Sequence, residues 1–195
     1  MPIPSFTIDG ILPPFVGPNG PGGAPEDLSP YATTAAEVVT TLATSPARNT
    51  ILKGWLAHRA ALKAIGFDRG FQWLDGSFVE DKEPQDLDIV SFFYRPPGIH
   101  DGNTLARLMH ANIGLFGRSQ VKATYSLDFF PVDLNGTPEA LVSLTRYWLG
   151  LFSHRRQDSL WKGMLQIRLE DEVDDAAAHA LLDPADPQLD NGGTP

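Results

Sequence analysis

The chain of 195 residues contains no cysteine. This absence excludes a disulfide framework and any metal site built from thiolates. A long hydrophobic run is also lacking, because no stretch approaches the roughly 18 consecutive apolar residues that a membrane-spanning helix needs. The first residues, MPIPSFTIDGILPPF, show neither a basic start nor an unbroken apolar segment, so we expect no signal peptide. These absences predict a cytoplasmic protein with no membrane attachment.

Basic residues are scarce as well: 15 Lys and Arg stand against 24 Asp and Glu, which gives a formal net charge of −9. General nucleic-acid binding rests on cations that neutralise phosphates, so an acidic chain is not expected to coat DNA or RNA. The charge is compatible with a small-molecule substrate or with a basic protein partner.

Length and composition predict one globular domain with two flanking segments. The apolar fraction of 42% is ordinary, and 195 residues suffice to bury a real core. Residues 1–30 are rich in Pro and Gly, which predicts an N-terminal arm. Residues 31–170 form the expected folded domain. Residues 171–195 are acidic and end in Pro, Asp and Gly, which predicts a partly disordered tail.

Helix signals recur along the domain. Thr34 and Glu37 have the spacing of a capping box, which predicts a short helix. Ser45-Pro46 offers an N-cap and an N1 proline for a second helix, whose apolar stripe ends at Gly66. Two further helices are predicted over residues 103–116 and 137–152.

Strand signals alternate with these helices. Residues rich in β-formers predict strands at 71–74, 86–94 and 124–134, whereas residues 161–169 fit either a strand or the start of a helix. The order predicts an α/β (α+β) fold, a mixed sheet of three or more strands flanked by helices, which we expect on one face.

Two acids stand inside the start of the second strand. Residues two apart in a strand point to the same face, so Asp86 and Asp88 aim at one spot while Leu87 and Ile89 point into the core. Two carboxylates this close repel each other unless a cation lies between them. Mg²⁺ or Mn²⁺ prefers such oxygen ligands. The alternative is that both acids merely begin a solvent-exposed strand.

A third acid is expected on the last strand. Asp128 lies among apolar residues, and three carboxylates on neighbouring strands suit a metal site for phosphoryl chemistry. Asp133 has a similar neighbourhood, but the turn pair Asn135-Gly136 follows it closely, so we prefer Asp128. Asp128 also fits two other interpretations, a polar group satisfied within the core or a charged residue that protects a sheet edge from further strand pairing.

The groups that could hold phosphates lie on both sides of these acids. Gly76 permits a close backbone approach, and Ser77 offers a hydroxyl and an amide to a phosphate oxygen. Lys82 lies in a loop, where it is either solvated or able to reach a triphosphate. Arg155 and Lys162 belong to a basic cluster that is either a decorated helix end or a phosphate clamp.

The stretch WLDGSFVEDKEPQDLDIV resembles the signature of the DNA polymerase β-like nucleotidyltransferase superfamily. In that superfamily an apolar residue and Gly-Ser are followed by a spacer of about ten residues and then by acid–apolar–acid–apolar. The segment 12–14, the LDGSFV motif and the region around Trp148, Arg155 and Lys162-Gly163 also resemble a little-characterised bacterial family with this core. The general signature covers about residues 50–134.

The resemblance implies a role for each matching residue. Asp86 and Asp88 would hold the metals, and Asp128 would complete the triad and help deprotonate the attacking hydroxyl. Gly76 and Ser77 would bind the β and γ phosphates. The spacer after Ser77 holds eight residues, which is shorter than usual and puts the strength of nucleotide binding in doubt.

The resemblance also implies the activity. We expect a Mg²⁺- or Mn²⁺-dependent transfer of NMP from an NTP, with ATP as the expected nucleotide, to a hydroxyl of a protein, RNA or small-molecule acceptor. By analogy with small bacterial relatives, the protein would act in a toxin–antitoxin or phage-defence module. The first alternative is a catalytically inactive, antitoxin-like binding partner with this fold. The second is an α/β ligand-binding domain without phosphate chemistry.

Overall fold

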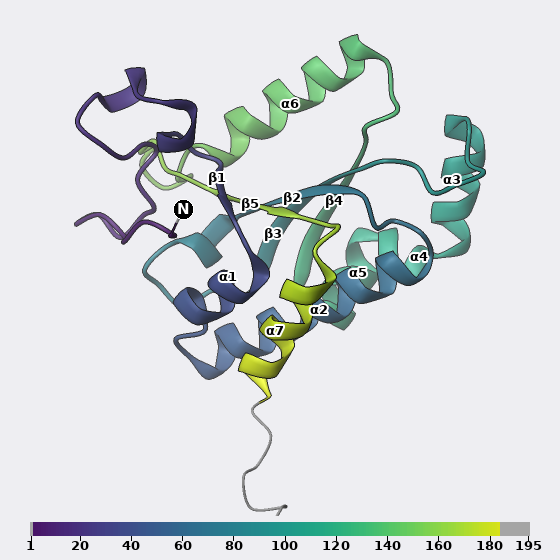
Figure 1. Cartoon of the computed structure of the whole chain (residues 1–195), viewed down its shortest axis with the longest axis horizontal. Helices are drawn as coiled ribbons and strands as arrows, with labels where there is room; N and C mark the ends of the chain where they lie inside the picture. The colour runs from purple at the N-terminus through teal and green to yellow at the C-terminus, as the bar shows by residue number, and fades with distance from the viewer. Residues whose placement is uncertain (1, 184–195) are drawn as a thin grey trace, which may run out of the picture.

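The protein, described here by a computed structural model over residues 2–183, is built on one five-stranded mixed sheet with the order β1-β5-β2-β3-β4 (Figure 1). The β1–β5 and β3–β4 pairs are parallel, and β2 runs antiparallel to both of its neighbours. The strands are β1 (Tyr31–Thr33), β2 (Gly70–Asp75), β3 (Leu87–Phe93), β4 (Leu127–Asp133) and β5 (Leu165–Arg168). The predicted mixed α/β fold is confirmed, and the ambiguous segment 161–169 contributes a strand.

The larger core lies on one face of the sheet, where α2 is the principal helix. Side chains of β3 and β4 such as Leu87, Ile89 and Phe129 pack there against Trp55 and Leu56 of α2. The helices whose apolar side chains share this core are α1 (Ala35–Leu42), α2 (Pro46–Ala64), α3 (Gly102–Ala111), α4 (Ile113–Phe116), α5 (Arg118–Tyr125) and α7 (Glu172–Leu182). In the part of the chain described, no helix is long and apolar enough to cross a membrane.

The expected capping residues begin their helices. The Thr34 hydroxyl accepts a hydrogen bond from the backbone N–H of Glu37, and the Ser45 hydroxyl accepts one from that of Arg48. The second half of the capping box differs, because the Glu37 carboxylate accepts from the backbone of Ile3 and from the hydroxyl of Thr33 instead. Glu37 therefore ties the N-terminal arm to α1.

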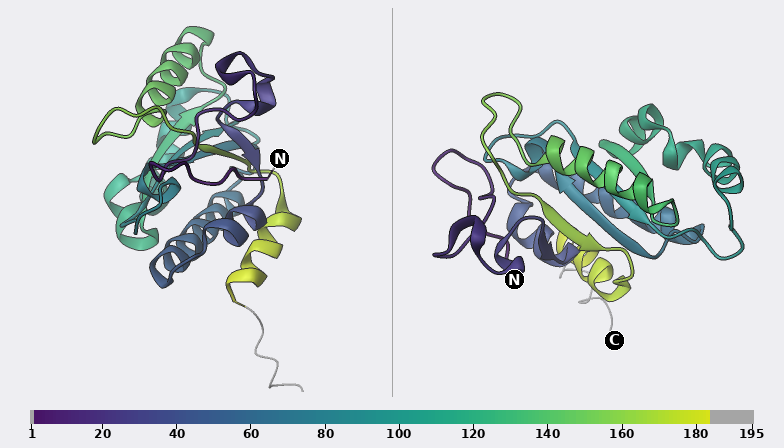
Figure 2. Two further views of the ribbon diagram at one scale, coloured as in Figure 1. Left: turned by 90° about the vertical axis from the view of Figure 1, so that its left-hand side faces the viewer. Right: turned by 90° about the horizontal axis from the view of Figure 1, so that it is seen from above.

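Helix α6 (Pro138–Phe152) covers the opposite face of the sheet, which corrects the expectation of helices on one face (Figure 2). Trp148 and Phe152 of α6 pack on Trp73, Val90 and Phe92 of the central strands. This second face is apolar along most of β2 and β3, so it needs a cover. Both faces of β2 and β3 are therefore buried. The acids lie on the face covered by α6, at one end of these strands.

The segment expected as a partly disordered tail contains α7, which packs against α1 and α2. The Asp174 carboxylate accepts hydrogen bonds from the backbone N–H groups of Ala35 and Ala36, which lie in the first turn of α1. Anions are favourable at that position, where backbone donors are otherwise unpaired. Acidic composition therefore misled the prediction, because the acids have partners in the fold. Residues 184–195 of the predicted tail lie outside the described residues.

The N-terminal arm runs beside the end of the sheet that carries the acids. It contains two short 3₁₀ helices, η1 (Gly20–Gly22) and η2 (Pro25–Asp27). Ile11 and Leu12 are buried, whereas Ile8 is fully exposed. Ile11 forms an isolated bridge with Glu80, and the Leu12 carbonyl accepts from the backbone of Gly163. The arm thereby joins two segments that line the candidate site.

Candidate functional site

Three aspartates form a row across β2, β3 and β4, at one end of these strands. In the strand register Asp88 of β3 is the direct partner of Asp75 on β2 and of Asp128 on β4. Direct partners point to the same face of a sheet, so all three carboxylates lie on the α6 face. Leu87 and Ile89 are fully buried in the core on the other face, as the alternation predicts.

Asp86 lies one residue before β3. Its carboxylate and that of Asp128 each form an ion pair with a different basic side chain. The Asp86 Oδ2 atom lies 2.5 Å from Lys122 Nζ. Both oxygens of Asp128 accept hydrogen bonds from Arg118, at 2.5 Å from Nε and 2.6 Å from Nη2. Within residues 2–183, no three acidic or histidine side chains gather closely enough to hold a metal ion in this arrangement.

Gly76 lies directly against the acidic row. Its φ of +72° is a conformation that favours glycine, and an added Cβ would overlap the carboxylate oxygen of Asp88. The position therefore requires glycine for two independent reasons. Ser77 follows in the 3₁₀ turn η3 (Gly76–Val79) and lines the cavity beside the acids. The structure thus brings Gly76 and Ser77 to Asp88, as the sequence predicts.

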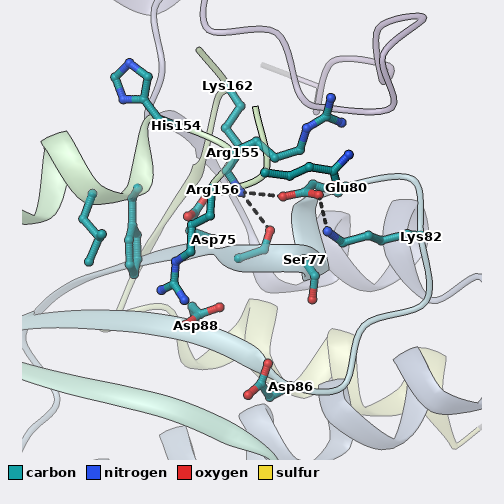
Figure 3. A pocket seen from close by; sticks show the side chains of 14 residues that line it. Asp75, Ser77, Glu80, Lys82, Asp86, Asp88, His154, Arg155, Arg156 and Lys162 are labelled. Atoms are coloured by element: carbon teal, nitrogen blue, oxygen red, sulfur yellow. Dashed lines mark hydrogen bonds and ion pairs between the residues drawn. The ribbon is translucent and has the colours of Figure 1, made fainter. Parts of the chain in front are cut away.

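A cavity of about 280 Å³ opens over this end of the row (Figure 3). Leu151 and Phe152 at the end of α6 form its apolar wall. Its charged and polar lining consists of Asp75, Ser77, Glu80, Lys82, Asp86, Asp88, His154, Arg155, Arg156, Gln157 and Lys162. Asp128 does not line it and lies beyond Asp88 in the row. Seven of the eight residues predicted for the site line one cavity, and the eighth, Asp128, is the register partner of one of them.

Lys162 is a buried anchor under the Gly76–Ser77 turn. Its side chain is 2% exposed, and its Nζ donates to the Gly76 carbonyl at 2.9 Å and to Glu80 Oε1 at 3.1 Å. It also lies 3.1 Å from Asp75 Oδ1, although this oxygen accepts no well-aligned hydrogen bond from any described residue. Lys162 therefore positions the turn from beneath and lies deeper than the surface clamp that the sequence suggested.

Burial raises the pKa of two acids in the row. The pKa of Asp75 rises to about 7, because burial outweighs the opposing effect of Lys162. The pKa of Asp88 rises to about 6 through burial and through the charges of Asp86 and Asp128. Glu80 differs: burial acts to raise its pKa, but the ion pairs with Lys82 and Lys162 keep it below its usual value. The charges of Arg156 and Lys162 oppose the rise at Asp88 without cancelling it.

The remaining predicted cations are paired at the rim of the cavity. Lys82 Nζ lies 2.6 Å from Glu80 Oε2, with half of its side chain exposed. Arg155 binds the Asp158 carboxylate and donates to the carbonyl of Asp9 at 2.7 Å. Arg156 points its guanidinium towards Asp88 (Figure 3), and its charge lowers the pKa of that acid. The basic cluster lies at the cavity, beyond the end of α6.

Asp133, the other candidate for the third acid, lies away from the row. It pairs with Phe93 at the far end of the β3–β4 ladder, and its Oδ2 atom lies 2.6 Å from Arg95 Nη2. Its second oxygen accepts from the backbone of Asn135, as expected for an acid that begins a turn. The geometry favours Asp128 as the partner of Asp88.

Sequence reasoning missed four charged groups at or beside the site: Asp75, Glu80, Arg118 and Lys122. Asp75 was missed because the predicted strand ended at residue 74, whereas β2 continues to Asp75. The position of Asp75 directly before Gly76 was the signal that could have identified it. Arg118 and Lys122 lie four apart on α5, which marks one helix face, but nothing local indicates that this face meets the acids.

Comparison with known proteins places residues 4–168 in one family, a family of unknown function designated DUF6932. No curated protein matches the chain, and no solved structure matches it. The matched region contains the acidic row, the Gly76–Ser77 turn and the cavity, and it ends before α7.

Proposed function

We propose that this chain, which belongs to the DUF6932 family of unknown function, is a metal-dependent nucleotidyltransferase that moves NMP from an NTP to an acceptor hydroxyl. The observation that carries the proposal is the register of Asp88 with Asp128, beside a turn where Gly76 packs on the Asp88 carboxylate. Acids on neighbouring strands next to a Gly-Ser turn are the arrangement that the sequence resemblance implies.

The donor set suits a hard divalent cation. Asp86, Asp88 and Asp128 offer carboxylate oxygens, the ligands that Mg²⁺ or Mn²⁺ takes. Burial and the charges of Asp86 and Asp128 raise the pKa of Asp88, an effect that a bound cation would oppose. Asp75 Oδ1 lies 3.1 Å from Lys162 Nζ but accepts no well-aligned hydrogen bond among the described residues. When bound, the metal would polarise the α-phosphate and neutralise charge on the triphosphate.

The chain's own residues have separate tasks in this reaction. Ser77 and the Gly76 backbone would bind the β and γ phosphates, with Arg156 and Lys82 at the rim of the cavity supplying positive charge. Asp128 would accept the proton of the acceptor hydroxyl while the hydroxyl oxygen forms its bond to the α-phosphorus. The bond from the α-phosphorus to the bridging oxygen then breaks, and pyrophosphate leaves. The cavity volume of about 280 Å³ suits the phosphate groups.

The test is calorimetric titration with Mg²⁺ or Mn²⁺ plus each NTP, on the wild type and on Asp86→Asn/Asp88→Asn. We expect metal-dependent binding of one NTP that the double variant loses, a change of at least roughly 100-fold for two ligands. Asp133→Asn is the matched control, because it removes an acid from the same sheet at the far end of β4. Equal NTP binding by the wild type and the double variant would refute this site.

The second candidate is a catalytically inactive binding partner with the same fold. It is favoured by exposed apolar side chains on and beyond α6, which include Val142, Tyr147, Leu149 and Trp161. Transfer of label from an α-labelled NTP to macromolecules of a cell extract separates the two. Label that appears with the wild type and disappears with Asp88→Asn supports the enzyme, whereas NTP binding without any transfer supports the inactive partner.

A further inference from the structure

Two basic side chains of α5 bind Asp86 and Asp128, the two outer acids of the proposed metal site, which lie on either side of Asp88. Arg118 grips both oxygens of Asp128, at 2.5 and 2.6 Å, and Lys122 Nζ lies 2.5 Å from Asp86 Oδ2. The two cations are four residues apart, so they project from the same side of the helix. Nothing in the proposed reaction uses either of them. One helix face thus supplies one counter-ion to each of the two acids that flank Asp88.

The path of the chain explains how α5 reaches these acids. Helix α5 packs on the α2 side of the sheet through buried Val121, and the chain enters β4 directly after Ser126. Since β4 is an edge strand, a long side chain can pass around it to the α6 face. Arg118 does so, with its guanidinium 5.0 Å from the centre of the Phe130 ring. The contact between Arg118 and Asp128 is therefore possible because β4 is the edge strand.

Asp88, the central acid, has no such counter-ion. Among the described residues it makes neither an ion pair nor a hydrogen bond, although Arg156 points its guanidinium towards it (Figure 3). The two ion pairs made by α5 therefore involve Asp86 and Asp128 and leave Asp88 out. A divalent ion that binds Asp88 needs oxygens from Asp86 and Asp128 as well, and those oxygens face α5.

We propose that Arg118 and Lys122 form a cation latch, which holds Asp128 and Asp86 until a divalent ion brought by the nucleotide displaces it. This inference rests on the proposed function for the identity of the metal ligands. A metal ion alone must compete with two intramolecular cations. A metal ion bound to a triphosphate brings further oxygen ligands and draws the acids away from α5. The latch thus couples metal binding to nucleotide binding.

The exposure of the two cations makes the latch displaceable. The side chains of Arg118 and Lys122 are 65% and 53% exposed, so each cation can turn into water without leaving a buried charge of its own, whereas Asp128 and Asp86 are 8% and 18% exposed. Lys162 provides the contrast, since its side chain is 2% exposed between Asp75 and Glu80, and such a pair is costly to break. The site therefore has one fixed cation and two that can leave.

The test is a titration with Mn²⁺ alone, without nucleotide, on the wild type and on Arg118→Gln, Lys122→Gln and the double variant. We expect each single variant to bind Mn²⁺ roughly two- to fivefold more tightly, and the double variant on the order of tenfold. Arg107→Gln on α3 is the control, because that exposed arginine bonds only within its own helix among the described residues. Unchanged or weaker Mn²⁺ binding by the double variant would overturn the latch.

Thermal unfolding supplies a second readout that does not depend on activity. Without metal, Arg118→Gln should melt below the wild type, because Asp128 loses its counter-ion. In saturating Mn²⁺ that difference should shrink, because the ion replaces the arginine. A deficit that persists in Mn²⁺ would mean that Arg118 is purely structural and would also overturn the latch.

The two proposals can fail separately. Tighter Mn²⁺ binding by the latch variants, with no NTP bound by any variant, supports the latch and sinks the nucleotidyltransferase. NTP binding that depends on Asp86 and Asp88, with Mn²⁺ affinity unaffected by Arg118→Gln or Lys122→Gln, sinks the latch and leaves the proposed function standing.

Discussion

The two faces of the sheet each bury a cluster of charged groups, and the clusters differ in how well their charges are matched. On the α2 face, the fully buried Arg59 donates to Asp175, to Gln72 and to the carbonyl of Arg168. Lys63 adds a second cation to Asp175 at 2.7 Å. Arg59 thus ties α2 to β2, to β5 and to α7 at once.

On the α6 face, the charges are left incomplete. Asp75 Oδ1 lies 3.1 Å from Lys162 Nζ but accepts no well-aligned hydrogen bond among the described residues, and Asp88 has neither an ion pair nor a hydrogen bond there. A buried acceptor left unpaired costs free energy, and a fold keeps such a group where a ligand can satisfy it. The comparison therefore separates a cluster that holds the fold together from the one at which we propose that a metal ion binds.

The largest effect is expected from breaking the matched cluster. Arg59→Met leaves the Asp175 carboxylate with Lys63 alone and removes a donor from Gln72, so we expect a loss of about 3–5 kcal/mol in the free energy of unfolding. Urea denaturation measures it. The control on the same helix is Lys53→Met, whose pair with Asp183 is exposed and should change stability by less than about 1 kcal/mol. Equal losses from both variants would contradict the assigned structural role.

The next effect concerns Asp75, and its sign depends on pH. The pKa of Asp75 is raised from 3.8 to about 7, so its contribution to stability is complete below pH 4 and is lost as the pH rises through 7. Asp75→Asn cannot ionise. The stability of the wild type relative to Asp75→Asn should therefore fall by on the order of 3 kcal/mol between pH 4 and pH 8.

Denaturant titrations at several pH values test this dependence, with Asp101→Asn as the companion variant. The pKa of Asp101 is lowered by hydrogen bonds from Thr104, so the stability of the wild type relative to that variant should rise with pH instead. A difference between the wild type and Asp75→Asn that does not change with pH would show that Asp75 remains charged or is solvated.

Much of the fold follows from local signals. The caps at Thr34 and Ser45 and the stop at Gly66 were readable because each acts within one turn of its helix. Strands β2, β3 and β4 were readable from their β-formers, although their ends shifted by up to three residues, whereas β5 was left open between strand and helix and β1 was not predicted. The position of α6 on the second face could not be predicted, because the apolar pattern of β2 and β3 does not reveal which helix covers which face.

The site could be predicted in part for the same reason. Asp86, Asp88, Gly76 and Ser77 lie in one continuous stretch, so their spacing was informative. The counter-ions of α5 were not foreseeable, since their meeting with the acids depends on α5 lying beside the edge strand β4. The anchoring of α7 was missed because acidic composition alone suggested solvation, whereas Asp174 and Asp175 each have partners in the fold.

The smallest effect compares two neighbours in the acidic row. Asp88 is a largely buried carboxylate with no ion pair or hydrogen bond among the described residues, and its pKa is raised to about 6 against the opposing charges of Arg156 and Lys162, so its ionisation opposes folding above that pH. Asp88→Asn should therefore raise the free energy of unfolding at pH 8 by about 1–2 kcal/mol, once partial exposure is allowed for. Asp128→Asn, one strand away, removes the partner of Arg118 and should not stabilise the protein.

Thermal unfolding at pH 8 with a chelator measures both variants. The gain from Asp88→Asn should vanish below pH 4, where the wild-type acid is protonated in the folded and unfolded states. If the two variants lowered stability equally, Asp88 would have a structural partner, and the distinction between the matched cluster and the site would fail at its central residue.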